Sequence, residues 1–187
     1  MSFPTGDITL SEICDAYSVQ KSISALRGKI YYYANGTSTL VPSSGDVGIN
    51  QFKGKYHSTT QGTLANQQVN HSNSGFWDGG VSGYINFTNA SYTVIGNTLV
   101  SLTLRFSEGG GNSGATSWSG NNSTNITVKF DNQIISTSIG LKTFTVSATS
   151  TLAISIFNQS SNNLGCQSGG GRTYTYNISS SGLSGPI

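Results

Sequence analysis

Charged side chains are scarce in this sequence. They make up 9% of the residues, against about 25% in a typical soluble domain. The Lys and Arg residues are scattered and form no run that would neutralise a row of phosphates, so we expect no nucleic-acid partner. Gly, Ser, Thr and Asn take the place of the missing charges. This composition predicts a surface that is polar but weakly ionic.

Long apolar runs are missing as well. No stretch approaches the roughly twenty consecutive apolar residues that a membrane-spanning helix needs, so the sequence predicts no membrane span. The opening residues, MSFPTGDITLSEICDAY, lack the basic and apolar blocks of a secretory signal. We therefore expect a soluble chain without such a signal.

Metal-ligating residues are few and badly spaced. Cys14 and Cys166 cannot make a zinc site or a disulfide framework, and we expect a small buried side chain and a loop thiol, with a bridge between them left open. His57 and His71 lie in a polar stretch without a ligand partner at helical spacing. They are predicted to be surface histidines, and we expect no metal and no cofactor.

Catalytic patterns are also lacking. The C-terminal part has three acidic residues, Asp78, Glu108 and Asp131, and acids beside glycine are usually turn residues rather than a glycosidase pair. No Gly-x-Ser-x-Gly turn is present, and the glycine-rich stretches GGGNSG and SGGGR lack the lysine of a phosphate loop. We expect a protein that is not an enzyme.

What the sequence does have, from residue 76 to residue 187, is alternation of apolar and polar residues. Strands of period two are typical of half-buried sheets, and turn residues separate them with no helical period between. This pattern predicts an antiparallel β-sandwich or jelly-roll-like domain. FDNQI is expected to form a tight hairpin turn, and residues 107–125 and 158–171 are expected to be loops. The predicted inward residues are Val100, Leu102, Leu104, Phe106, Ile126, Val128, Phe130, Phe144, Val146, Ala148, Leu152, Ile154, Ile156, Tyr174, Tyr176 and Ile178.

Two tryptophans are the candidate contacts of this domain. Trp118 lies in the middle of the longest polar stretch, and Trp77 stands at the start of the domain in GFWDGG. An exposed indole can stack on a sugar or anchor a protein contact, whereas a buried one would cover the end of the core. Its place in a loop favours contact for Trp118.

The front of the chain repeats a phrase. PTGDITLSEI at residues 4–13 returns as PSSGDVGINQF at residues 42–52, and each copy predicts a turn leading into a brief strand or a single helical turn. In the first copy Ser11 is expected to cap a helix through EICDAY. Residues 57–75, polar and without a period, are predicted to be a linker or an extended arm.

Residues 1–56 look too small to complete a core alone, which predicts a module that docks on other subunits. The candidate docking residues are the apolar positions of the two copies and the tyrosines between them: Ile8, Leu10, Ile13, Tyr31, Tyr32, Tyr33, Val47, Ile49 and Phe52.

The repeated phrase resembles a signature of virion structural proteins of tailed phages, especially those of cyanobacteria, and of some large DNA viruses. In that signature a Gly is followed by a repeated Ile-x-Leu/Ile-Ser phrase and a Gly-Lys ending. The first copy matches at Ile8, Leu10, Ser11 and Ile13, and the second at Val47, Ile49, Phe52, Gly54 and Lys55, although Asn50 replaces the usual Ser.

The resemblance implies a virion protein assembled in the host cytoplasm. The tail, baseplate or fibre apparatus is the first expectation, with other virion proteins as partners in a homo-oligomer or an attached ring. A capsid decoration or cement protein is the second expectation. A carbohydrate-binding module that recognises a host surface glycan is the third.

Overall fold

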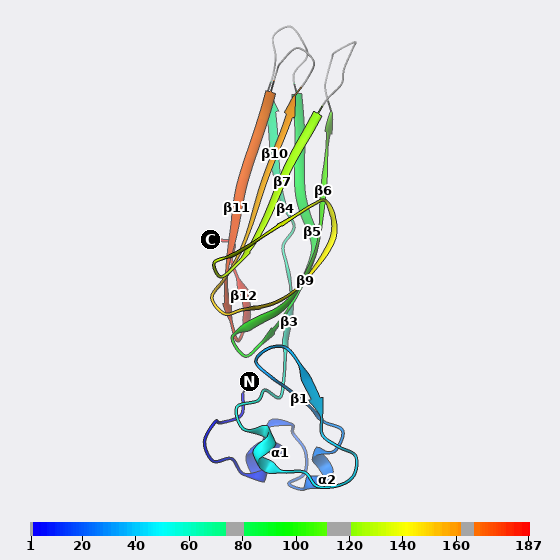
Figure 1. Ribbon diagram of the computed structural model, residues 1–187, viewed down its shortest axis with the longest axis vertical. Helices are drawn as coiled ribbons and strands as arrows, with labels where there is room; N and C mark the ends of the chain where they lie inside the picture. Colours follow the sequence, from blue (N-terminus) through cyan, green and yellow to red (C-terminus); the bar gives the residue numbers. More distant parts are fainter. Residues whose placement is uncertain (1, 74–80, 112–120, 162–166) are drawn as a thin grey trace.

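The computed structural model describes residues 2–73, 81–111, 121–161 and 167–187. Figure 1 shows an elongated molecule with a small N-terminal module at one end and a body of strands that run along the long axis. The predicted fold class, a mainly β protein with antiparallel sheets and a short helix in the N-terminal module, is confirmed. No helix in the described ranges is long and apolar enough to cross a membrane.

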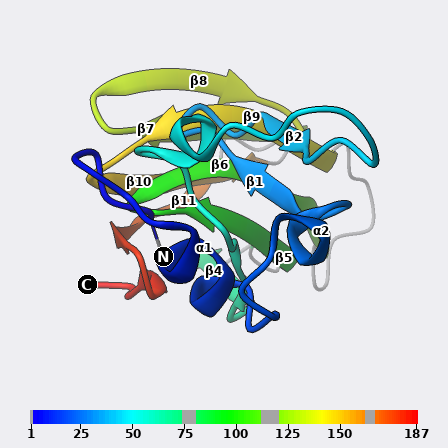
Figure 2. The ribbon, with the colours of Figure 1, turned by 90° about the horizontal axis from the view of Figure 1, so that it is seen from below.

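The N-terminal module is built from short elements. In Figure 2, seen from below, these elements lie in front of the ends of the body strands. β1 and β2 form an antiparallel ribbon. The elements are α1 (Leu10–Ala16), α2 (Ile23–Leu26), β1 (Ile30–Tyr32), β2 (Ser38–Leu40) and the 3₁₀ helix η1 (Ile49–Phe52).

Helix α1 begins two residues earlier than a Ser11 cap would place it. Thr9 is the N-cap, and its hydroxyl accepts a hydrogen bond from the Glu12 backbone N–H at 3.3 Å. The Glu12 carboxylate accepts one in return from the Thr9 N–H at 2.7 Å, which completes a capping box. The hydrogen bonds that the Thr9 N–H and the Thr9 hydroxyl donate to the carboxylate lower the pKa of Glu12. The expected Ser11 cap is wrong because only Thr9 has a reciprocal partner three residues on.

The second copy of the phrase ends in a shorter helix. It forms η1, a single 3₁₀ turn whose C-cap is Lys53. Gly54 follows with φ +65°, a backbone conformation that favours glycine and ends the element. Each copy therefore leads into one helical element, of seven residues in α1 and four in η1.

The body consists of two antiparallel sheets. In the first sheet the order is β3-β5-β6-β9, with β4 beside β3 on the same edge of β5; in the second it is β12-β11-β10-β7-β8. The first sheet contains β3 (Thr60–Leu64), β4 (Gln67–Asn73), β5 (Val81–Ile95), β6 (Thr98–Gly111) and β9 (Gly140–Ala148). The second contains β7 (Asn121–Phe130), β8 (Gln133–Thr137), β10 (Thr151–Ser161), β11 (Gln167–Ser179) and β12 (Gly182–Ser184).

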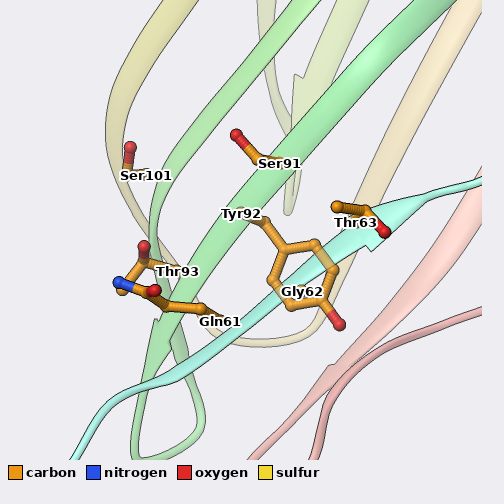
Figure 3. A pocket seen from close by; sticks show the side chains of 7 residues that line it. All are labelled: Gln61, Gly62, Thr63, Ser91, Tyr92, Thr93 and Ser101. Carbon is orange, nitrogen blue, oxygen red and sulfur yellow. The ribbon is translucent and has the colours of Figure 1, made fainter.

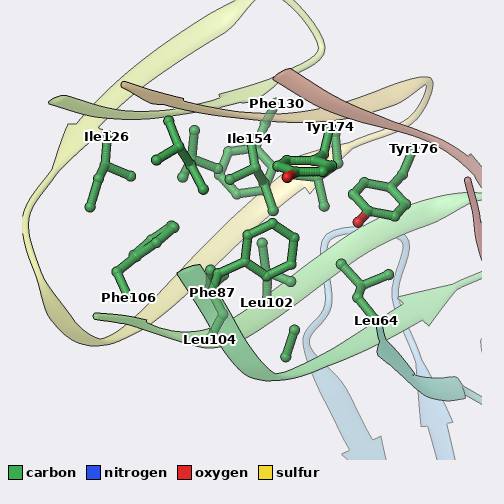
Figure 4. Close-up of a cluster of buried hydrophobic side chains, with 14 of the residues drawn as sticks. Leu64, Phe87, Leu102, Leu104, Phe106, Ile126, Phe130, Ile154, Tyr174 and Tyr176 are labelled. Atoms are coloured by element: carbon green, nitrogen blue, oxygen red, sulfur yellow. The ribbon is translucent and has the colours of Figure 1, made fainter. Parts of the chain in front are cut away.

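The core lies between the sheets (Figure 4). The predicted inward residues fill it with three exceptions. Phe144 and Val146 are only partly buried against the same cluster. Val100 is buried outside the cluster, against Gly36 of the module, because a register shift in β6 places Leu99 in the core instead. Phe87 of the first sheet meets Tyr174 of the second edge to face, with ring centroids 5.5 Å apart. The alternation in the sequence therefore identified the core of a sandwich.

The predicted linker belongs to the body. Most of residues 57–75 form β3 and β4, which pair with β5 along one edge, so the interpretation as a linker or arm is wrong. Leu64, Val69 and His71 are buried, while most of the other side chains remain accessible to water. An edge strand gains its backbone ladder from one neighbour and needs few apolar side chains, which is why the sequence showed no period.

The two predicted polar loops are also largely strand. β6 continues to Gly111 and β7 begins at Asn121, while β10 continues to Ser161 and β11 begins at Gln167. β10 pairs with β7 and β11 on both sides up to Ser161. Backbone ladders hold these polar segments, so the absence of apolar alternation there did not mean a loop.

Asp131 fixes the corner at which the chain crosses between the sheets. It lies in the predicted hairpin turn after β7, with φ +45°, and its carboxylate accepts backbone hydrogen bonds from Thr149, Ser150 and Thr151, each at 2.8 Å. Those residues join β9 of the first sheet to β10 of the second. Burial by itself would raise the pKa of Asp131, but the hydrogen bonds from Thr149, Thr151 and Ser150 outweigh it and hold the pKa well below its usual range.

We predict that Asp131→Asn lowers the free energy of unfolding by about 1–3 kcal/mol at pH 7, because hydrogen bonds to a charged acceptor are lost. Asparagine tolerates the positive φ, so the backbone turn itself is kept. Urea denaturation measures the effect. Asn132→Ala, in the same turn, is the control and should change stability by less than about 0.5 kcal/mol.

The difference in the free energy of unfolding between wild type and Asp131→Asn should depend on pH. A carboxyl whose pKa is lowered by folding makes its full contribution to the stability of the folded state above its unfolded pKa of about 3.9. This contribution is lost as the pH falls through the folded pKa. The stability difference between wild type and Asp131→Asn should therefore shrink steadily below about pH 4. A difference that stays constant from pH 7 to pH 2 would contradict this role of the carboxylate.

Candidate functional site

The residues expected to dock on other subunits are mostly internal. Ile8, Ile13, Tyr31 and Phe52 are buried in the module's own cluster, together with Phe3, Cys14, Leu26 and Val41. The docking interpretation is wrong for these four residues because their side chains already fill a core. Cys14 is buried, as expected.

The other five expected docking residues are partly buried. Leu10, Tyr33, Val47 and Ile49 pack against the same cluster from its rim. Tyr32 exchanges backbone hydrogen bonds with Tyr56, at 2.8 and 2.9 Å, and so ties the ribbon to the segment that enters the body. These residues stabilise the module first and offer only their outer edges to a partner.

The ribbon carries an exposed apolar pair that the sequence did not single out. Ile30 and Leu40 lie directly opposite each other on β1 and β2. Their side chains are 43% and 56% exposed. Directly opposed residues on one face of a ribbon form a continuous patch. Among the described residues of the module, these two are the exposed large apolar side chains.

A shallow hollow of about 400 Å³ lies on the outer face of the first sheet (Figure 3). Gln61, Thr93 and Ser101 form one cross-strand row, and Thr63 and Ser91 form the next. Gly62 lets the Tyr92 ring lie across β3, because a Cβ there would overlap the ring. The lining offers neutral hydroxyl and amide groups, which suits hydrogen bonding to a polar ligand. This hollow is lined in part by the stretch predicted to be a linker.

A second hollow of about 460 Å³ lies between β8 and β9. Its apolar lining comes from Phe130, Ile135 and Val146, and its polar rim from Asp131, Gln133, Thr145 and Ser147. β8 and β9 are edge strands of opposite sheets. The sandwich is therefore open along this side.

The opposite side of the sandwich is closed. Thr60 of β3 donates to the Ser180 carbonyl at 2.9 Å, and the Tyr174 hydroxyl donates to the Gln68 carbonyl at 3.3 Å. A Cβ at Gly182 would overlap the Tyr92 ring, so this ring fills the gap between the two sheets. The two edges of the body thus differ.

The core becomes polar toward the end of the body farthest from the module. Asn158 is fully buried and its Oδ1 accepts from the Thr124 hydroxyl at 3.4 Å, while the Thr124 hydroxyl also bonds to Glu108 across the sheets. His71 is only 5% exposed, so its predicted surface position is wrong. Burial lowers its pKa, which favours the neutral imidazole.

The remaining predicted residues divide in two groups. Trp77, Trp118, Asp78 and Cys166 lie outside the described residues. Glu108 and Asp131 are the two described acids of the body. Glu108 links β6 to β7 across the two sheets, and Asp131 holds the corner before β10. No group of three His, Cys, Asp or Glu side chains in the described ranges is placed to hold a metal ion.

We predict that Phe52→Ala lowers the free energy of unfolding by about 3–5 kcal/mol, because Phe52 is fully buried in the module. Ile30→Ala, on the same module, should cost less than about 1 kcal/mol. Thermal and chemical denaturation of both variants measure the difference. Equal, small effects would show that the module's cluster is not a core.

Comparisons with protein-family models, with curated proteins and with solved structures found no match to this chain. Three described features carry its functional interpretation: the exposed pair Ile30 and Leu40, the hydroxyl-lined hollow around Thr93, and the open edge along β8.

Proposed function

We propose that the chain is a structural component of a phage virion, most simply of the tail, baseplate or fibre apparatus. Two observations support this. The N-terminal module carries the repeated phrase that resembles virion proteins, and it lies at one end of an elongated body (Figure 1). An attachment unit at one end and a long polar body beyond it suit a protein that is displayed on a particle.

The junction between module and body supports a fixed direction of display. Gly36, in the ribbon turn, lies against Val100 of β6: a Cβ there would come within 3.1 Å of the Val100 Cβ. A Cβ at Gly96, in the turn between β5 and β6, would overlap the ring of Tyr56. These two close packings brace the module against the body.

Attachment through the module requires an exposed surface. Because the conspicuous apolar residues of the repeated phrase are largely internal, the exposed pair Ile30 and Leu40 takes that role in the proposal. Apolar residues on a short ribbon suit the centre of a modest protein interface.

The first test is the double variant Ile30→Asp, Leu40→Asp. We predict that it folds like the wild type but is lost from purified particles by at least about tenfold, because two charges would have to be desolvated at the interface. Quantitative mass spectrometry of particles from complemented infections measures incorporation. Ile187→Asp, a charge at another exposed apolar residue, is the matched control.

The same measurement distinguishes tail from capsid. A capsid decoration protein would be present at a copy number close to that of the capsid subunits, whereas a tail component would be far less abundant. Absence of the wild-type chain from particles would overturn the virion proposal in both forms.

A second candidate, glycan binding, is favoured by the hollow on the first sheet. Its neutral hydroxyl and amide lining matches the hydrogen-bonding groups of a sugar. Glycan-array binding by the full chain tests this candidate, with Thr93→Val as the variant and Thr143→Val, outside the hollow on the same sheet, as the control. Binding that both variants retain would place the ligand elsewhere.

A further inference from the structure

Strand β8 is an unprotected edge of the second sheet. Among the described strands, β7 is its only partner. Residues 133–141 contain no charged residue and no proline. Natural edge strands are usually protected by lysine, proline, a bulge or a covering segment. The exposed apolar side chains of β8 are Ile134 and Ile135, and Ile139 follows in the connection to β9.

The register of β7 and β8 shows which backbone groups are free. The turn between Phe130 and Gln133 has two residues, so this flanking pair is a hydrogen-bonded pair of the ladder. Alternation then makes Val128 and Ile135 the next hydrogen-bonded pair. The N–H and C=O groups of Ile134 and Ser136 consequently point away from β7, toward the open edge.

We propose that β8 pairs in antiparallel fashion with β8 of a second copy of this chain. The two-fold axis passes beside Ile135, which faces Ile135 of the other copy, while each Ile134 lies opposite a Ser136. In this register Ile134 and Ser136 exchange backbone hydrogen bonds on both sides of the axis, four bonds in all by the antiparallel rule. The second sheet of one copy then continues into that of the other.

The chemistry of the edge favours a second copy over another partner. A strand without charge meets itself without like-charge repulsion, which is what an isologous contact requires. The centre of the contact is apolar, because Ile135 borders the hollow with Phe130 and Val146. In the dimer the two Ile135 side chains would face each other, each at the border of its own copy's hollow. The opposite edge of the sandwich is already tied to its neighbouring sheet and offers no such surface.

This inference does not depend on a virion role, since it concerns the purified chain alone. Failure to find the chain in particles would leave it intact. A monomeric chain that is incorporated into particles would overturn it and leave the virion proposal intact.

Sedimentation equilibrium of the full chain, with Ser136→Pro, is the first test. Proline at this position removes an N–H that points to the open edge and leaves the β7 ladder complete. We predict a dimer whose dissociation constant rises by about 100-fold or more in Ser136→Pro, and stays within about threefold of wild type in Ser136→Ala. If Ser136→Pro fails to fold, Ile134→Lys replaces it, with Ile134→Val as its control, and the same rise is expected.

Disulfide trapping tests the register. In a Cys166→Ser background, Ile135→Cys places two thiols at a non-hydrogen-bonded pair, where the Cα atoms of facing residues lie about 4.5 Å apart. We predict an Ile135→Cys cross-link under mild oxidation and none for Thr137→Cys, because Thr137 faces Gln133 of the other copy. A monomer at every concentration overturns the proposal. So does a dimer that resists Ser136→Pro and forms no cross-link at residue 135, since it would use another surface or another partner strand.

Discussion

The pairing of β10 on both sides is the constraint on which the body depends. This strand forms eleven residue pairs with β11 and ten with β7, so both of its edges are used from Leu152 to Ser161. Its inward residues Leu152, Ile154 and Ile156 are at most 2% exposed. A slip of one residue would turn these three side chains to water and break both ladders at once. The corner held by Asp131 sets where this strand begins.

The sequence predicted the body well where packing decides the structure. Residues such as Val128, Ile154 and Tyr176 alternate with polar neighbours because a sheet with one buried face requires it, and that period is visible in a single sequence. Prediction from the sequence failed where only backbone hydrogen bonds to neighbouring strands hold a polar segment in place. β4 and the far ends of β6 and β11 contain few apolar side chains, and nothing local indicates that a neighbour will pair with them.

The N-terminal module shows a different limit. The repeated phrase marks apolar residues that are important for the module. A sequence alone, however, does not distinguish an apolar residue that contacts its own chain from one that contacts a partner. Phe52 and Ile13 are enclosed because Phe3, Leu26 and Val41 come from elsewhere in the module. In the sequence, Ile30 and Leu40 each have the pattern of an ordinary strand residue. The Asn35-Gly36 dipeptide is a hairpin signal, but a two-residue turn there would pair Ile30 with Val41. The observed loop has one residue more, which places Ile30 opposite Leu40.

The scarcity of charge has a consequence for the conditions in which the protein can work. The described residues hold two ion pairs, Lys21 with Asp15 and Lys53 with Asp7, both at the surface of the module. Dissolved salt weakens attractions between exposed charges but leaves buried apolar contacts and backbone ladders nearly untouched. Because neither ion pair lies in the body, we expect the stability of its described strands to depend little on ionic strength.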